Sequence, residues 1–128
     1  MIILLDSSTT ICKIALLDGE WRQDYSWESD RNLAKWLLGY LDKILKEHIK
    51  AWTDISAIGV FEGPGSFTGI RIGLTVMNTI ADSQKIPIVG ARGENWKDEV
   101  LAKLESGKNE KIVLPFYNRD ANITKPRK

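Results

Sequence analysis

The segment 63–69 has the composition that could most directly do chemistry in this sequence. It is a loop rich in glycine, proline and hydroxyl residues that follows a predicted strand and opens a predicted helix. Glycine allows tight turns, and the peptide N–H groups at a helix start attract anions. The lysine of a P-loop is missing, because Ile70 and Arg71 stand there, although Arg71 could neutralise a phosphate. Two interpretations stay open: a structural turn capped by Ser66 or Thr68, and an anion-binding loop.

Histidine and cysteine each occur once, which excludes several kinds of site. His48 alone cannot supply a paired-histidine zinc motif, and it lies too far from the serines for a Ser-His-Asp triad. Cys12 alone cannot form an internal disulfide or a CxxC motif. We expect His48 to lie near a helix C-terminus and Cys12 to be a small buried side chain in a strand. The sequence therefore predicts no catalytic residue, no metal and no cofactor.

The length and composition are those of one ordinary globular domain. The chain has 128 residues, 43% hydrophobic and 27% charged, so it can bury a core without disulfides. Eighteen lysines and arginines against 17 aspartates and glutamates leave a net charge of +1, which gives no overall attraction to nucleic acid or acidic lipid. No run approaches the roughly 18 apolar residues of a membrane span, and the apolar start lacks the basic segment of a signal peptide. We expect a cytoplasmic protein without membrane contact.

Hydrophobic periodicity predicts three antiparallel strands, followed by helices that alternate with strands. The expected strands are residues 2–5, 11–17, 20–28, 54–61 and 86–89, with an edge strand at 111–116 that Pro115 interrupts. The expected helices run from a cap at Ser29 or Asp30 to about residue 49, over 69–83 and over 95–105. Asp18-Gly19 marks the first hairpin. This order predicts an α/β fold, with a mixed five- to six-stranded sheet and helices on its faces, as in a ribonuclease-H-like half-domain.

The two longer helices are apolar over more of their surface than one sheet face requires. On the first, two aromatic residues widen a leucine stripe. On the second, two glycines four residues apart expose backbone, while another side already offers a face for the sheet. We therefore expect a helix–helix interface with another chain. Its expected residues are Leu33, Trp36, Leu37, Tyr40, Gly69, Gly73, Val76, Met77 and Ile80.

The glycine-rich loop also carries a family resemblance. Residues 63–73 read Gly-Pro-Gly-Ser-Phe-Thr-Gly-Ile-Arg-Ile-Gly, after an Ile-Gly-Val strand at 58–60 and an N-terminal Leu-Asp-Ser-Ser-Thr at 5–9. Together with Ile-Pro-Ile-Val-Gly at 86–90, this pattern resembles the TsaB (YeaZ) family over residues 1 to 91, the first lobe of that family. The resemblance implies an actin-like fold with degenerate nucleotide chemistry.

The resemblance also implies a function. Members of the family act as the non-catalytic partner of TsaD, the subunit that transfers threonylcarbamoyl to adenosine 37 of tRNA, and the two subunits pair through first-lobe helices. It implies a TsaD-like partner, a TsaE-like ATPase in the same complex and only indirect contact with tRNA. Because a lone chain would leave its paired helix surface exposed to water, we also expect a homodimer in isolation.

The sequence departs from the family pattern in three segments. Residues 29–32 and 91–94 replace the family's His-Ser and Ser-Leu-Glu stretches, and residues 111–119 resemble its C-terminal Pro-x-Tyr-x-Arg ending. We expect a short form that lacks most of the second lobe, with a single lobe over 1–118 and a basic tail over 119–128. For the cluster of Arg119 and residues 125–128, a solvated tail and a contact with tRNA or a partner both stay open.

Asp6 stands where active relatives in the fold carry Asp-x-Gly-x-Ser/Thr, whose glycine admits a phosphate and whose aspartate orients magnesium. Ser8 occupies the glycine position, so either a structural remnant or a residual nucleotide contact is open. The leading hypothesis is a binding module without catalysis. The alternative is a small nucleotide-binding hydrolase or phosphotransferase. Its expected anion or nucleotide residues are Asp6, Gly63, Gly65, Ser66, Thr68 and Arg71.

Overall fold

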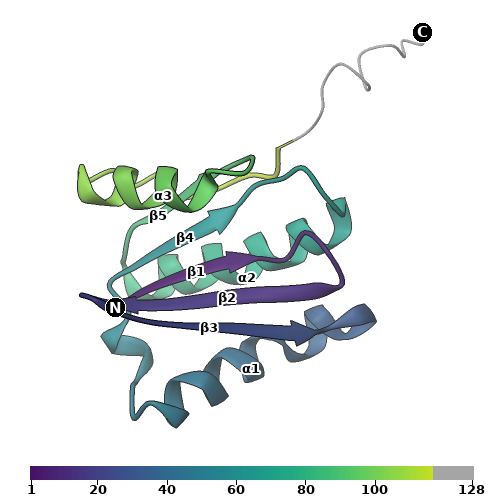
Figure 1. Cartoon of the computed structure of the whole chain (residues 1–128), viewed down its shortest axis with the longest axis horizontal. Helices are drawn as coiled ribbons and strands as arrows, with labels where there is room; N and C mark the ends of the chain where they lie inside the picture. Colours follow the sequence, from purple (N-terminus) through teal and green to yellow (C-terminus); the bar gives the residue numbers. More distant parts are fainter. Residues whose placement is uncertain (117–128) are drawn as a thin grey trace, which may run out of the picture.

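In the part of the chain that the structure describes, five strands form one mixed sheet in the order β3-β2-β1-β4-β5 (Figure 1). The computed structural model describes residues 1–116, so the predicted basic tail and positions 117 and 118 of the predicted lobe lie outside the described residues. The strands are β1 (Ile2–Asp6), β2 (Ile11–Asp18), β3 (Trp21–Glu28), β4 (Ala57–Phe61) and β5 (Ile88–Ala91). β1, β2 and β3 are antiparallel neighbours, whereas β4 runs parallel to both β1 and β5.

Within residues 1–116, α-helices cover both faces of this sheet (Figure 1). The helices α1 (Leu33–Glu47) and α2 (Phe67–Gln84) pack on one face, and α3 (Trp96–Glu105) packs on the other. Two short 3-10 turns, Asp30–Asn32 and Trp52–Asp54, lead into α1 and toward β4. Within residues 1–116, no helix combines the length and the apolar character needed to cross a membrane.

Alternation of side chains along the strands builds a core on each face of the sheet. In β1, Ile3 and Leu5 pack beneath α1 and α2, whereas Leu4 packs beneath α3. Cys12 of β2 belongs to the larger core and is fully buried, as predicted. Burial, together with the nearby charge of Asp6, raises the pKa of the Cys12 thiol to about 12. The thiol therefore behaves as a neutral apolar group.

The predicted order of strands and helices is confirmed, with boundaries that differ by a few residues. The hairpin at Gly19 joins β2 to β3, and Gly19 has the positive φ that such a turn requires. The predicted edge strand at 111–116 is wrong. Val113 N and O instead bond to the side-chain amide of Asn78, each at 2.9 Å, and Phe116 N donates to Glu62 O at 2.9 Å.

Three side-chain bonds and one backbone bond, rather than a sixth strand, satisfy the outer edge of β5 within residues 1–116. Asn109 Oδ1 accepts from Ile88 N at 3.1 Å, and Glu110 N donates to Ile88 O at 2.9 Å. Glu110 Oε1 accepts from Gly90 N at 2.7 Å, and Lys103 Nζ donates to Gly90 O at 2.5 Å. These four bonds use the backbone groups that strand pairing needs, which explains why residues 111–116 add no strand.

The predicted side-chain cap of α1 is also wrong. Ser29 and Asp30 come before α1, which begins at Leu33 without a side-chain cap. The Ser29 hydroxyl instead donates to a carbonyl of the β1–β2 connection at 3.1 Å. His48 ends α1 at the predicted place, but its Nε2 contacts the Tyr25 hydroxyl of β3. The histidine therefore ties α1 to the edge of the sheet.

Candidate partner-binding surface

A groove runs between α1 and α2 on their solvent side. Two adjoining hollows of about 430 and 440 Å³ form it, and both are lined by Ala34, Thr75 and Val76. Leu38 also lines the groove, with 53% of its surface exposed. We call this surface the helix groove. Its lining residues are Ala34, Leu38, Trp52, Thr68, Arg71, Ile72, Thr75, Val76, Thr79, Ile80, Ser83 and Gln84.

Helix geometry explains why apolar side chains reach this groove. Leu37 and Leu41 lie on the sheet side of α1 and are almost completely buried. Leu38 follows about 100° further around the helix, so it lies on the flank that faces α2. On α2, Leu74 is buried against the sheet, whereas Val76 is half-buried at the groove. Each helix therefore presents one apolar face to the sheet and a second, narrower one to solvent.

Three residues predicted for the partner interface lie inside the protein, which corrects that part of the prediction. Leu33, Leu37 and Met77 are 4%, 0% and 0% exposed and pack in the core between the helices and the sheet. Helical periodicity identifies an apolar flank, but it does not say which of two neighbouring flanks meets the sheet. Val76 and Ile80 do line the helix groove.

Gly69 and Gly73 also face inward, against the prediction that they admit a second helix. A Cβ on Gly73 would meet Ser7 Oγ and would lie 2.9 Å from Leu5 Cδ2, and a Cβ on Gly69 would meet the Ser7 carbonyl. The two glycines therefore bring α2 against the end of β1. They serve the packing of this chain rather than a partner interface.

Trp36 and Tyr40 lie on the opposite flank of α1 from the helix groove. Tyr40 stacks on Trp27 of β3, with ring centroids 4.9 Å apart, and Trp36 lines the same hollow as this pair. The single interface expected from the sequence thus divides into two surfaces on α1. The expected interface residues do not include Leu38, although its position beside Ala34 on a second apolar flank of the first helix was the signal for it.

Hydrogen bonds hold the glycine-rich loop 63–69 within the chain. Ser66 Oγ accepts from Gly69 N at 3.3 Å, which confirms Ser66 as the cap of α2. Ser66 N donates to Ser8 O at 2.8 Å, and Ser7 Oγ donates to Gly69 O at 2.8 Å. A Cβ on Gly65 would lie 2.5 Å from Ser8 Cβ, so only glycine allows this approach. The loop and the β1–β2 connection therefore form one packed unit.

Two other residues predicted for the anion site, Thr68 and Arg71, line the same part of the helix groove. The Arg71 guanidinium lies 5.2 Å from the centroid of the Phe67 ring. Gly63 O accepts from Gly93 N at 3.2 Å. Anion binding by this loop stays a prediction.

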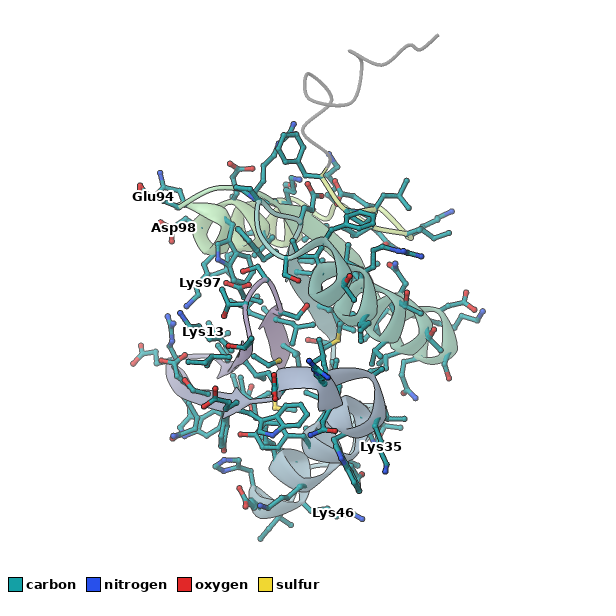
Figure 2. All side chains as sticks on the ribbon, turned by 90° about the vertical axis from the view of Figure 1, so that its right-hand side faces the viewer. Lys13, Lys35, Lys46, Glu94, Lys97 and Asp98 are labelled. Carbon is teal, nitrogen blue, oxygen red and sulfur yellow. The ribbon has the colours of Figure 1, made fainter. Side chains whose placement is uncertain are left out.

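Asp6 lines a separate hollow of about 440 Å³ on the α3 side of the sheet. Its Oδ1 accepts from Ser8 N at 2.9 Å. Lys13 of β2 and Lys97 of α3 line the same hollow, and Figure 2 shows these lysines on one side of the molecule. No residue of 63–69 lines this hollow. Sequence reasoning missed both lysines, because strand alternation does not reveal which helix lies opposite.

Comparisons with known proteins decide the family. The family model described as "TsaD: tRNA N6-adenosine threonylcarbamoyltransferase" matches residues 27–92, just over half of the chain. The tRNA threonylcarbamoyladenosine biosynthesis protein TsaB of Escherichia coli (strain K12) is 29% identical over 131 residues, which cover 94% of this chain and 56% of that protein. The chain belongs to the TsaB (YeaZ) family. This confirms the resemblance and the α/β fold class inferred from the sequence.

Further relatives of this TsaB-family chain agree. TsaB of Bacillus subtilis (strain 168) is 35% identical over 88 residues, 68% of this chain and 38% of that protein. A solved structure described as "YeaZ from Pseudomonas aeruginosa" is 31% identical with a TM-score of 0.66, over 71% of this chain and 43% of that one. Another, described as an uncharacterized protein similar to peptidase YEAZ from Pseudomonas aeruginosa, has a TM-score of 0.67. The chain spans about half the length of the curated relatives it matches, or less.

Proposed function

We propose that this chain is a non-catalytic partner subunit of a TsaD-like threonylcarbamoyltransferase. In this role it supports N6-threonylcarbamoylation of adenosine 37 in tRNA. The observation that carries the proposal is the helix groove, whose exposed Leu38 and half-buried Val76 find no cover among residues 1–116. The names of the TsaB relatives supply the pathway.

The physical basis is burial of apolar surface at a helix–helix interface. An apolar side chain that is half exposed in the free subunit becomes an anchor when a partner helix covers it, and such anchors carry most of the binding energy of an interface. Leu38 lies on α1 and Val76 lies on α2, so one partner helix laid along the groove contacts both. The same groove would hold a second copy of the chain when the partner is absent, which gives a homodimer.

Two features support a subunit without catalysis of its own. Ser8 places a Cβ against Gly65 where a phosphate would have to approach, and the Ser7 hydroxyl is engaged with the start of α2. The hollow that Asp6 lines contains no residue of the glycine-rich loop. A TsaE-like ATPase joins the complex in this proposal, and tRNA contacts the TsaD-like subunit.

The test measures binding of the purified chain to a TsaD-like protein by calorimetry. We expect Leu38→Ala and Val76→Ala each to weaken binding about tenfold. Ile112→Ala is the matched control, because Ile112 is 65% exposed and lies outside the helix groove. Unchanged affinity of both groove variants would remove the groove from the proposal. No binding by the unmodified chain, together with unchanged threonylcarbamoyladenosine after its deletion, would remove the function.

A further inference from the structure

The flank of α1 that faces away from α2 carries a second surface. It is an open hollow of about 500 Å³ between α1 and the edge strand β3. We call it the aromatic hollow; its lining residues are Trp27, Asn32, Trp36, Gly39, Tyr40 and Lys43. It shares no residue with the helix groove, so the proposed function does not account for it.

The aromatic side chains of the hollow offer flat apolar faces. Trp27 and Tyr40 are stacked on each other with an interplanar angle of 19°, so each ring holds the other in place. Trp36 is 52% exposed, and the Lys35 ammonium lies 5.1 Å from the centroid of its ring. Figure 2 shows Lys35 on the solvent side of α1. A large exposed ring beside a cation suits a planar ligand that carries negative charge.

The polar side chains of the hollow have hydrogen-bonding capacity to spare. Within residues 1–116, the side chains of Asn32 and Lys43 form no hydrogen bond or ion pair, whereas Lys46 on the same helix pairs with Asp42 at 2.9 Å. An amide can donate to and accept from the edge of a base, and an ammonium can contact a phosphate. The hollow therefore combines the three kinds of group that bind an unpaired nucleotide.

Gly39 supplies the most specific observation. It lies inside α1, where glycine costs about 1 kcal/mol relative to alanine. Its φ is not positive, and a Cβ placed on it would find no atom within 4 Å. Neither backbone conformation nor internal packing requires glycine here. The space that a Cβ would enter is open to solvent beside the aromatic hollow.

We propose that the aromatic hollow binds an unpaired nucleobase of RNA, which stacks on Trp36 while Asn32 contacts its edge and Lys43 its phosphate. The choice of RNA over DNA rests on the proposed function, to which it adds a direct contact of this chain with RNA in place of the indirect contact expected from the family resemblance. A protein segment fits less well, because it would have to cover the Asn32 amide and the Lys43 ammonium with matching groups. With a net charge of +1 for the whole chain, binding is local and depends on stacking more than on general attraction to a polyanion.

The test uses a short fluorescein-labelled oligoadenylate RNA and the full chain, with binding followed by fluorescence anisotropy. We expect Trp36→Ala to weaken binding about tenfold and Lys43→Gln to weaken it severalfold with a smaller dependence on salt. Gly39→Ala should weaken binding while raising the melting temperature, a combination that a purely structural role does not produce. Ile112→Ala is the control and should bind RNA normally, because Ile112 is exposed and lines neither the helix groove nor the aromatic hollow.

Further measurements distinguish an RNA-binding site from a DNA-binding site and from a protein-binding surface. The RNA duplex of the same length should not compete, because its bases are stacked and paired. Equal affinity for the matching DNA would overturn the assignment to RNA. No binding of the oligonucleotide, or binding unchanged in both Trp36→Ala and Gly39→Ala, would overturn the site. If Trp36→Ala weakens binding to the TsaD-like partner but not to RNA, the aromatic hollow is a protein-binding surface instead. The proposed function is tested separately, because Leu38→Ala changes the helix groove on the other flank of α1 and its readout is binding to the TsaD-like protein.

Discussion

Gly73 of α2 and Gly39 of α1 are both glycines inside helices, but the structure around them differs. Gly73 is required by packing, because the end of β1 occupies the space that its Cβ would need. Gly39 has open space around it and no packing requirement. The same residue type therefore marks an internal contact at one position and an external surface at the other. Sequence alone cannot separate these cases, since both glycines stand among apolar residues at helical spacing.

Replacing each glycine with alanine should shift stability in opposite directions. Gly73→Ala forces Ser7 and Leu5 to move, and such overpacking costs about 1–3 kcal/mol of unfolding free energy. Gly39→Ala should add up to about 1 kcal/mol, because alanine favours the helix and nothing obstructs its methyl group. Urea denaturation measures both. A Gly73→Ala variant as stable as the unmodified chain would contradict the packing described for Gly73, and a destabilised Gly39→Ala variant would contradict the open space at Gly39.

The buried thiol of Cys12 should make stability depend on alkaline pH. Its pKa is raised from 9.0 to about 12, so the neutral form is favoured in the folded chain. Below pH 9 this contribution is complete, and it is lost as the pH rises from 9 toward 12, because the unfolded thiol ionises first. Denaturation over this range should show the loss, and Cys12→Ala should show less of it. Rapid labelling of the native thiol by a maleimide at pH 8 would argue against its burial.

At the scale of elements, the outer edge of β5 shows where prediction from sequence succeeds and fails. The apolar run of β1 and the Asp18-Gly19 turn are local signals, so the sheet and its first hairpin could be predicted. The apolar residues of 111–116 also indicate a strand, but the side chains of Lys103 and Glu110 already occupy the edge where it would pair. That competition depends on contacts between separated segments, which periodicity does not contain.

Removing the Glu110 carboxylate should expose this edge to solvent. Glu110→Ala leaves Gly90 N without an acceptor, and a buried donor without a partner costs about 1–3 kcal/mol. Amide hydrogen exchange at Gly90 should accelerate, as measured by NMR. Lys108→Ala is the matched control, because Lys108 pairs with the same carboxylate at 3.7 Å with an exposed side chain, and its loss should change stability little. Equal exchange rates in the two variants would show that Glu110 does not protect the edge.

At the scale of the whole molecule, one sheet separates two cores. The larger core lies beneath α1 and α2, and the smaller one lies beneath α3. Both cores use alternate residues of β1 and β4, so neither can lose its packing while the strands of the other stay in place. Fold class and element order were predictable from such patterns, and the sequence narrowed the cap of α2 to Ser66 or Thr68. The division of Leu37 and Leu38 between core and surface was not, because it depends on the angle at which α1 meets the sheet.

The shared sheet predicts a single unfolding transition. Val100 of the smaller core is fully buried and packs so closely on Gly59 that a Cβ there would lie 2.8 Å from Val100 Cγ2. Val100→Ala should therefore lower the free energy of unfolding by about 2 kcal/mol. Circular dichroism and tryptophan fluorescence should report one common midpoint in urea, shifted to lower concentration in the variant. Separate midpoints for the two signals would mean that α3 and its core unfold independently.

The two edges of the sheet differ in how readily they can pair with a strand from another molecule. At β5, an incoming strand must first break the hydrogen bonds made by Asn109, Glu110 and Lys103. Breaking them costs free energy, which disfavours strand addition at this edge. At β3, an eight-residue strand that pairs only with β2 among the described residues presents its other side without such a barrier. Any extension of the sheet by a neighbouring molecule therefore has a fixed direction, outward from Trp21–Glu28.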